Sequence, residues 1–408
     1  MNTETFIIVG ASMAGAKAAE SLRAGGFEGR IVLVGEEPSP PYERPPLSKA
    51  FLRGETDREG THVHAAAFYS EHEIDLRSST RAEEIDVTSR EVVLTGGERL
   101  RFDRLLLATG AAVRRLPVEG AELDGVHYLR SVEDSEALRE RLQPGSRIAV
   151  VGAGWIGAEV AASARQRGAE VMLIDPQEVP LQRVLGKSVG AVYRDLHAEN
   201  GVELRLGAGV ESFEGSGKVE RVLTSSGESI NAETVIVGVG VTPRTELAER
   251  AGLEIDNGIV VDGRLETSVP GIYAAGDVAN HRHPQFGPLR VEHWGNALNQ
   301  GLAAGKAMLG ADEPYARVPY FFSDQYDVGM EYSGSASSGD EVVFRGDPAG
   351  REFIAFWLRD ERVVAGMNVN VWDVTDPIQA LVRSGAAVDR DRLTDPDQPL
   401  EELASCIA

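Results

Sequence analysis

Short runs of consecutive apolar residues recur along the chain, and they predict its buried strands. The first run, "FIIV" from Phe6, is followed by glycine and then by "ASMAGAKAAESL". This pattern predicts a buried strand, a tight glycine turn and the first turns of a helix.

The same order returns at Arg147, in "RIAVVGAGWIGAEVAASARQRGAEVMLIDP". In both copies a further apolar strand follows the helix, "RIVLVGEE" in the first and "VMLIDP" in the second. Strands that alternate with helices are typical of parallel sheets. The sequence therefore predicts an α/β protein with two similar domains.

Three later apolar runs predict strands that end in turns. "LRFDRLLLATGA" ends at Thr109 and Gly110, "TVIVGVGVTPRTEL" carries Gly238 and Gly240, and "GIYAAG" precedes Asp277. Beyond Asp277 we expect an irregular loop that contains histidines. Taken singly, the end of each run is as typical of an ordinary turn after a strand as of a turn that contacts a ligand.

The pattern changes from Tyr315 onward, where no glycine turn of this kind occurs. "REFIAFWLRDERVVAGMNVNV" predicts two paired strands joined at "RDER". "DPIQALVRSG" predicts a short helix that a glycine ends. We therefore expect a separate α+β domain of about 90 residues.

Charge and composition exclude several classes of function. The 408 residues carry a net charge of −23, which argues against a nucleic-acid partner. The longest apolar runs are far too short to cross a bilayer. The N-terminus leads directly into the first strand without a secretory signal, so we expect a cytoplasmic protein with no membrane partner.

The cysteine and histidine content limits the chemistry further. Cys406 is the single cysteine, so an internal disulfide and a redox dithiol are both impossible. His281, His283 and His293 lack the spacing of a metal site, and we expect no metal. Roles in a loop or beside a cofactor suit these histidines better.

The glycine turns point to dinucleotides. The second copy has Gly152, Gly154 and Gly157, which is the complete fingerprint of a pyrophosphate-binding turn. Its second strand ends in Asp175, about 20 residues after the last glycine, where a carboxylate can bind the ribose hydroxyls. One such fingerprint is weak evidence, but two in one chain are strong.

The first copy departs from the fingerprint at its middle position. It has Gly10, Ser12 and Gly15, and its second strand ends in Glu36. Serine adds a small Cβ and a hydroxyl that can donate to a phosphate, while the amide N–H groups stay in place. We therefore expect a working site at this turn.

With these pieces in order, the chain resembles the FAD-dependent NADH:ferredoxin reductases of bacterial oxygenase systems, within the glutathione-reductase-like flavoproteins. The resemblance runs from Phe6 to about Leu381. It rests on "YERPPLSK", "ATGA", "YLRSVEDSEALRERL", "VVGAGWIGAEVAA", "AAGDVA", "RVEHWGNALNQG" and "PYFFSDQY".

The resemblance implies two Rossmann-type domains, for FAD and NAD, plus a C-terminal α+β domain. FAD would bind a discontinuous domain of residues 1–110 and 237–315. NADH would bind residues 111–236, and residues 316–408 would form the C-terminal domain.

The resemblance also implies site residues. Lys49, near the flavin, and Glu159, by the nicotinamide, would be the catalytic pair. The implied FAD-binding residues are Gly10, Ala11, Ser12, Ala14, Gly15, Glu36, Arg44, Lys49, Ala82, Thr109, Gly110, Arg130, Gly276, Asp277 and Trp294. The implied NAD-binding residues are Gly152, Gly154, Ile156, Gly157, Glu159, Asp175, Arg183 and Gly240.

The implied partner is a small acidic [2Fe–2S] ferredoxin, with a cytochrome P450 or another oxygenase downstream. Members of the family commonly have tryptophan where this chain has Phe322, which bears on the choice of electron acceptor. From Tyr315 to the end the chain has eight arginines, no lysine and 17 acidic residues, a net charge of −9. A docking patch would need local arginines, and Arg290, Arg317, Arg359 and Arg362 are the candidates.

Two alternatives remain open. One is an NADH:quinone or NADH oxidase-type flavoprotein, because "PPYERPPLSK" has no cysteine and electrons must leave for an outside acceptor. The other is a redox-sensing interaction protein that resembles apoptosis-inducing factor. Scattered solvated charge explains any one of the four arginines better than docking does.

Overall fold

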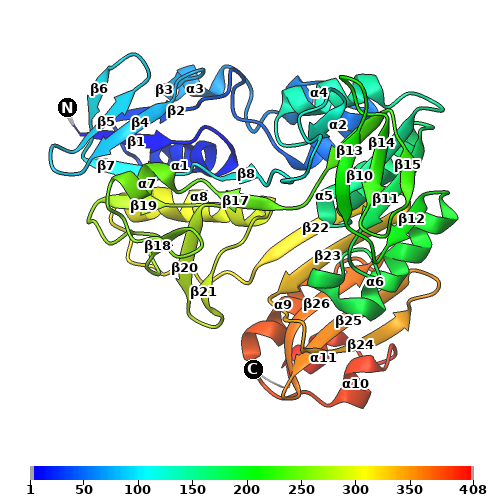
Figure 1. Cartoon of the computed structure of the whole chain (residues 1–408). Coiled ribbons are helices and arrows are strands. Elements are labelled where there is room, and N and C mark those ends of the chain that lie inside the picture. Colours follow the sequence, from blue (N-terminus) through cyan, green and yellow to red (C-terminus); the bar gives the residue numbers. More distant parts are fainter. Residues whose placement is uncertain (1–3, 406–408) are drawn as a thin grey trace. The chain divides into compact units, whose positions relative to one another are not determined.

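The computed structural model describes residues 4–405, which group into two compact units (Figure 1). Unit 1 consists of residues up to Glu43, Arg58–Ala112 and Val241–Pro319. Unit 2 consists of Arg44–Asp57, Val113–Gly240 and the chain from Tyr320. Cys406 lies outside the described residues. No helix within residues 4–405 is long and apolar enough to cross a membrane.

A five-stranded parallel sheet forms the centre of unit 1 in the order β19-β7-β1-β2-β3. Every residue of β1 after the first is buried, because the sheet is covered on both faces. The strands are β1 (Thr5–Val9), β2 (Arg30–Val34), β3 (Ile74–Arg77), β7 (Arg104–Leu107) and β19 (Ile272–Ala274).

Helices α1 (Met13–Ala24) and α8 (Trp294–Met308) pack closely against one another in unit 1. Small residues permit this approach, since a Cβ on Gly301 would lie 2.4 Å from the carbonyl oxygen of Ala14. The hydroxyl of Ser21 also donates to the carbonyl of Leu302 at 2.8 Å.

Smaller elements complete unit 1. One antiparallel sheet joins β4 to β6, and a second small sheet has the order β18-β20-β21. The elements are β4 (Ala82–Asp86), β5 (Glu91–Leu94), β6 (Arg99–Arg101), β18 (Ile259–Val261), β20 (Ala279–His283), β21 (Gly287–Leu289), η2 (Glu59–Thr61), α3 (Phe68–Glu71) and α7 (Glu246–Arg250). The pair β8 (Ala111–Val113) and β17 (Val241–Pro243) forms a further short ribbon.

The loop expected after Asp277 is in fact strand β20, and that prediction was wrong. Its residues pair in parallel with β18, from Ile259 opposite Ala279 to Val261 opposite His281. The polar histidines hid a strand whose side chains are mostly buried. Long-range pairing decided the structure here, as it often does for strands.

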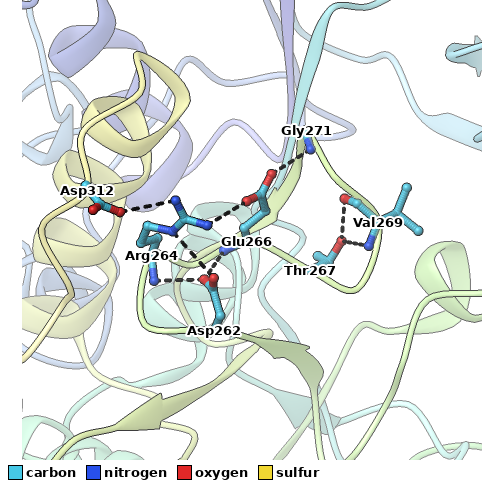
Figure 2. Close-up of polar contacts among 7 residues, drawn as sticks. All are labelled: Asp262, Arg264, Glu266, Thr267, Val269, Gly271 and Asp312. Atoms are coloured by element: carbon cyan, nitrogen blue, oxygen red, sulfur yellow. Dashed lines mark hydrogen bonds and ion pairs between the residues drawn. The ribbon is translucent and has the colours of Figure 1, made fainter.

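The loop between β18 and β19 is held by a set of polar contacts that Figure 2 shows. The carboxylate of Asp262 accepts from the amides of Arg264 at 2.8 Å and Glu266 at 3.0 Å. The Arg264 side chain in turn meets Asp262, Glu266 and Asp312. Glu266 then accepts from the amide of Gly271 at 2.7 Å. These contacts fix the entry to β19, the strand that leads to Asp277.

A second five-stranded parallel sheet forms one part of unit 2, in the order β12-β11-β10-β16-β9. Its strands are β9 (Val126–Tyr128), β10 (Arg147–Val151), β11 (Glu170–Asp175), β12 (Glu203–Leu206) and β16 (Thr234–Val237). Its helices are α4 (Val132–Arg141), α5 (Trp155–Gln166) and α6 (Gln182–Glu199), and a small sheet has β13 (Val210–Glu214), β14 (Arg221–Thr224) and β15 (Ser229–Asn231). The segment with η1 (Pro45–Ser48) and α2 (Ala50–Arg53) packs against α5.

The rest of unit 2 is an antiparallel sheet in the order β22-β23-β26-β25-β24. Its elements are β22 (Tyr320–Gln325), β23 (Val328–Gly334), β24 (Glu341–Asp347), β25 (Glu352–Arg359), β26 (Arg362–Val369), α9 (Thr375–Ser384), α10 (Arg390–Thr394) and α11 (Leu400–Ser405). Apolar residues of α6, among them Leu185 and Val189, share one buried cluster with this sheet.

The predicted fold class is confirmed: two parallel-sheet α/β regions and a C-terminal antiparallel sheet with helices. The hairpin at "RDER" is β25 with β26. The short helix is α9, which Gly385 ends in a left-handed conformation.

We predict that Asp262→Ala lowers the thermal unfolding midpoint of the holoprotein, because two backbone amides lose their acceptor. The cost should be about 1 kcal/mol. Arg264→Ala is the matched control, and it should change the midpoint less because its ion pairs are exposed. Differential scanning fluorimetry measures both, and an equal or larger loss in Arg264→Ala would contradict the prediction.

Candidate active site

Two glycines of the first turn are required by close backbone packing. Gly10 has φ +118°, and a Cβ there would lie 2.1 Å from the carbonyl oxygen of Ala108. A Cβ on Gly15 would lie 1.9 Å from the carbonyl oxygen of Gly10. The turn therefore tolerates no side chain at its first and third positions.

The middle position has no such constraint. Ser12 is extended, with φ −124° and ψ −159°, and its hydroxyl does not cap α1. Gly154, at the same place in the second turn, has φ −75°, and no atom lies within 4 Å of a Cβ placed there. A serine fits this position, and the amides of the first helical turn stay available to an anion.

Glu36 has a partner that the sequence did not suggest. Its carboxylate forms an ion pair with Arg244, and both side chains are partly exposed. Arg244 is fixed through its backbone, because its amide donates to Gly110 at 3.0 Å and its carbonyl accepts from Thr109 at 2.8 Å. Thr109, Gly110 and Glu36 thus share one neighbour, Arg244, at the end of the sheet.

The Gly276–Asp277 turn lies beside α1. A Cβ on Gly276 would lie 3.1 Å from that of Ala14, and the Gly276 amide donates to buried Gln300 at 2.8 Å. The carbonyl of Asp277 accepts from Arg290 at 3.1 Å.

Trp294 is the first residue of α8, and its indole N–H interacts with the carboxyl of Glu43. Burial raises the pKa of Glu43, while Lys17 and this hydrogen bond lower it. Ala82 is also buried, at the start of β4.

The second turn repeats this geometry in unit 2. Gly152 has φ +100°, and a Cβ on Gly157 would lie 1.9 Å from the carbonyl of Gly152. The carboxylate of Asp175 accepts from the amides of Ala153 and Gln177, each at 2.7 Å. Asp175 therefore holds the turn in place while its remaining lone pairs can accept from a ribose.

Exposed apolar side chains mark the surroundings of this turn. Ile156 is 45% exposed and Val184 is 42% exposed, which is unusual for such residues. The amide of Leu181 donates to the carbonyl of Ala153 at 2.8 Å, so the start of α6 lies at the turn. Arg183 is exposed beside Val184, and Gly240 has open space around it. Val184 was not among the predicted residues, and no sequence signal identifies it.

Lys49 and Glu159 form a buried ion pair in unit 2, with Nζ 2.7 Å from Oε2. Ser48 also donates to Glu159 at 2.5 Å, and Ser323 donates at 2.7 Å. The ammonium of Lys49 lies 5.6 Å from the centroid of the Phe322 ring. Neither serine was predicted, since only the three-dimensional structure brings residues 48, 159 and 323 together.

Arg44 and Arg130 lie together in unit 2. The guanidinium of Arg44 donates to the carbonyl of Arg130. The amide of Arg130 donates to Asp134 at 3.0 Å, next to the capping box that starts α4.

Three of the four candidate docking arginines have partners within the chain. Arg290 pairs with Glu292 at 2.6 Å and Arg359 with Asp340 at 2.7 Å, while Arg362 donates to the carbonyl of Gly385. The two carboxylates offset part of the positive charge that Arg290 and Arg359 offer to a partner.

The three candidate histidines lie in unit 1. Burial lowers the pKa of both His281 and His293 to about 4, and it lowers that of His283 as well. No group of His, Cys, Asp and Glu within the described residues could hold a metal ion.

These features fit two dinucleotides. Each glycine turn has a helix N-terminus for a pyrophosphate and a carboxylate for a ribose. No atom lies within 4 Å of a Cβ on Gly154, which leaves room for a phosphate to approach, and Ser12 occupies the equivalent place in the first turn.

Comparisons with known proteins agree with this fit. A family model described as pyridine nucleotide-disulphide oxidoreductase matches residues 4–301, and a reductase C-terminal model matches residues 320–404. The chain is 40% identical to the ferredoxin–NAD(+) reductase component of an anthranilate 1,2-dioxygenase system from Burkholderia cepacia, over 97% of this chain and 98% of that protein. It is 36% identical to putidaredoxin reductase from Pseudomonas putida, over 98% and 96%.

Solved structures give the same result. Putidaredoxin reductase in its covalent complex with putidaredoxin superposes with a TM-score of 0.96 at 36% identity, over 100% of this chain and 99% of that chain. The ferredoxin reductase of the CYP199A2 system from Rhodopseudomonas palustris gives a TM-score of 0.95 at 35% identity, over 98% and 100%. The predicted cofactors, FAD and NADH, are confirmed. The role of each site residue stays a prediction.

We predict that Ser12→Gly keeps FAD bound, because it removes no amide donor. It should cost at most one hydrogen bond, about 0.5–1.5 kcal/mol. Gly15→Ser is the contrasting variant, because its Cβ would clash with the carbonyl of Gly10. It should lower the affinity for FAD by more than about a hundredfold, roughly 2.8 kcal/mol.

Titration of the apoprotein with FAD, followed by flavin fluorescence, measures both affinities. Circular dichroism checks that each apoprotein is folded. A hundredfold loss in Ser12→Gly would mean that the serine hydroxyl is essential for binding.

Proposed function

Because this chain belongs to the pyridine nucleotide-disulphide oxidoreductase family, we propose that it is a FAD-dependent NADH:ferredoxin oxidoreductase, EC 1.18.1.-. It passes electrons from NADH, one at a time, to a small acidic [2Fe–2S] ferredoxin. That ferredoxin serves a cytochrome P450 or a ring-hydroxylating oxygenase. Relatives that match along nearly their whole length are named ferredoxin–NAD(+) reductase components of dioxygenase systems, or putidaredoxin reductase.

One observation carries the proposal: Lys49, which forms a buried ion pair with Glu159, comes from the segment where disulfide reductases of this class have cysteines. Cys406 is the single cysteine of the sequence, and it is remote from this segment in the chain. Electrons must therefore leave for an acceptor outside the protein. The single cysteine also supports a cytoplasmic location.

Each residue then has a role in binding or orientation. Bound FAD supplies the conversion of a two-electron hydride into single electrons. Gly10–Gly15 and Glu36 bind the FAD pyrophosphate and ribose, and Gly152–Gly157 and Asp175 bind those of NADH. Lys49 places a positive charge by the flavin, and Glu159 keeps that charge compensated in the buried site.

The domain assignment belongs to the same proposal. FAD binds residues 1–110 and 237–315, NADH binds residues 111–236, and residues 316–408 complete the protein. The glycine turns, one in each of the first two domains, support this division.

Turnover with ferredoxins tests the proposal directly. NADH oxidation is measured with a panel of [2Fe–2S] ferredoxins, with cytochrome c as the final acceptor. We expect at least one ferredoxin to raise cytochrome c reduction well above the rate without ferredoxin. Efficient turnover with quinone or oxygen alone would favour the oxidase alternative, and slow flavin reduction with a long-lived charge-transfer band would favour a redox sensor.

We also predict a preference for NADH over NADPH of about a hundredfold in kcat/KM, or about 3 kcal/mol. A 2′-phosphate would meet the carboxylate of Asp175 and would remove the ribose hydrogen bond. Ferricyanide as the acceptor makes the measurement independent of the natural partner.

Glu178→Gln is the control for general repulsion. Glu178 already pairs with Lys187 at 2.8 Å and is exposed, so this change should leave the preference nearly intact. Equal kcat/KM for the two coenzymes in the unmodified enzyme would mean that Asp175 does not face the ribose.

A further inference from the structure

The carboxylate of Glu159 is buried and accepts hydrogen bonds from three side chains. Oε2 accepts from Ser48 at 2.5 Å and from Lys49 at 2.7 Å. Oε1 accepts from Ser323 at 2.7 Å. Ser323 comes from β22, in the C-terminal sheet of unit 2, whereas Glu159 is on α5.

Ser323 is held from behind by a buried chain of polar groups. The amide nitrogen of Gln325 lies 3.3 Å from the Ser323 hydroxyl. The carbonyl oxygen of Gln325 lies 3.0 Å from Nε2 of His197, on α6. Gln325 is 1% exposed and His197 is fully buried, so water does not replace these bonds.

The protonation state of His197 fixes which group donates and which accepts along this series of hydrogen bonds. Burial lowers the pKa of His197 to about 4, so the ring is neutral at physiological pH. Its Nδ1 is buried and has no hydrogen-bond partner within the described residues, whereas Nε2 faces the carbonyl of Gln325. The single proton therefore sits on Nε2 and is donated to Gln325. Gln325 then presents its NH₂ group to Ser323, whose own proton is left to donate to Glu159.

We propose that Ser323, held by Gln325 and His197, is a positioning residue of the redox centre. It orients Glu159 and compensates part of its negative charge, which leaves more of the positive charge of Lys49 to act on the flavin. This inference rests on the proposed function only in placing Lys49 and Glu159 beside the flavin and the nicotinamide.

Strand β22 touches the ion pair with both of its faces. Successive side chains of a strand point to opposite faces, so Phe322 lies opposite Ser323 and Gln325. Phe322 approaches Lys49, and Ser323 approaches Glu159. The C-terminal sheet therefore contacts each charge through a different residue of one strand.

The test compares flavin midpoint potentials of the holoenzyme at pH 8, measured by equilibration with reference dyes. In Ser323→Ala the Glu159 carboxylate loses one hydrogen-bond donor. More of its negative charge then offsets the positive charge of Lys49, so reduced flavin is less favoured. We expect a three- to tenfold fall in the equilibrium constant for reduction, about 15–30 mV for a two-electron couple. Glu159→Gln should shift the potential the opposite way, and Gln325→Leu should shift it as Ser323→Ala does, by less.

Ser333→Ala is the matched control. Ser333 is also a buried serine of the same sheet, but its partner is Gln379 rather than Glu159. It should leave the potential unchanged, even if it lowers thermal stability as much as Ser323→Ala does. Equal potentials in Ser323→Ala and the unmodified enzyme, or equal shifts in Ser323→Ala and Ser333→Ala, would overturn the proposal.

Single-turnover reduction by NADH provides a second readout. Ser323→Ala should slow the rate constant of flavin reduction three- to tenfold, with little change in the Kd of NADH, because Glu159 loses its orientation. An unchanged rate constant, or a loss confined to Kd, would contradict the positioning role. Both measurements need no ferredoxin, so failure to find a ferredoxin partner would refute the proposed function without affecting this test.

Discussion

The burial of two opposite charges, Lys49 and Glu159, is the constraint on which much of unit 2 depends. Removing an ion pair from water costs several kcal/mol per ion, and only good geometry with further hydrogen bonds offsets that cost. The protein supplies those bonds from η1 and from β22. Segments that are far apart in sequence must therefore meet at one carboxylate, and this couples the early loop, α5 and the C-terminal sheet.

The sequence predicted those parts of the site that depend on neighbouring residues. Gly10, Gly15, Gly152 and Gly157 are recognisable because strand, turn and helix are consecutive in the chain. The acidic residues at or just after the ends of the second strands were predictable for the same reason. Local pattern failed at β20, whose polar histidines resemble a loop and whose partner strand sets the structure.

Contacts between distant segments could not be predicted in this way. Nothing near Glu36 indicates Arg244, and nothing near Glu159 indicates Ser48 or Ser323. Serine and arginine are common surface residues, so their contacts with these carboxylates show only in the fold. The candidate docking arginines show the opposite, because here the fold weakens a prediction. Arg359 and Arg290 were candidates from the sequence, but Asp340 and Glu292 already compensate their charges.

Because side chains alternate between the two faces of β22, the number of residues in this strand also decides which side chains reach the ion pair. Inserting or deleting one residue between Tyr320 and Phe322 would slide every later side chain of the strand to the opposite face. After an insertion an aromatic ring would meet the carboxylate, and after a deletion a hydroxyl would meet the ammonium. Homologous chains should therefore tolerate indels in the connection before Tyr320 but preserve the residue count within the strand, whatever residues occupy it.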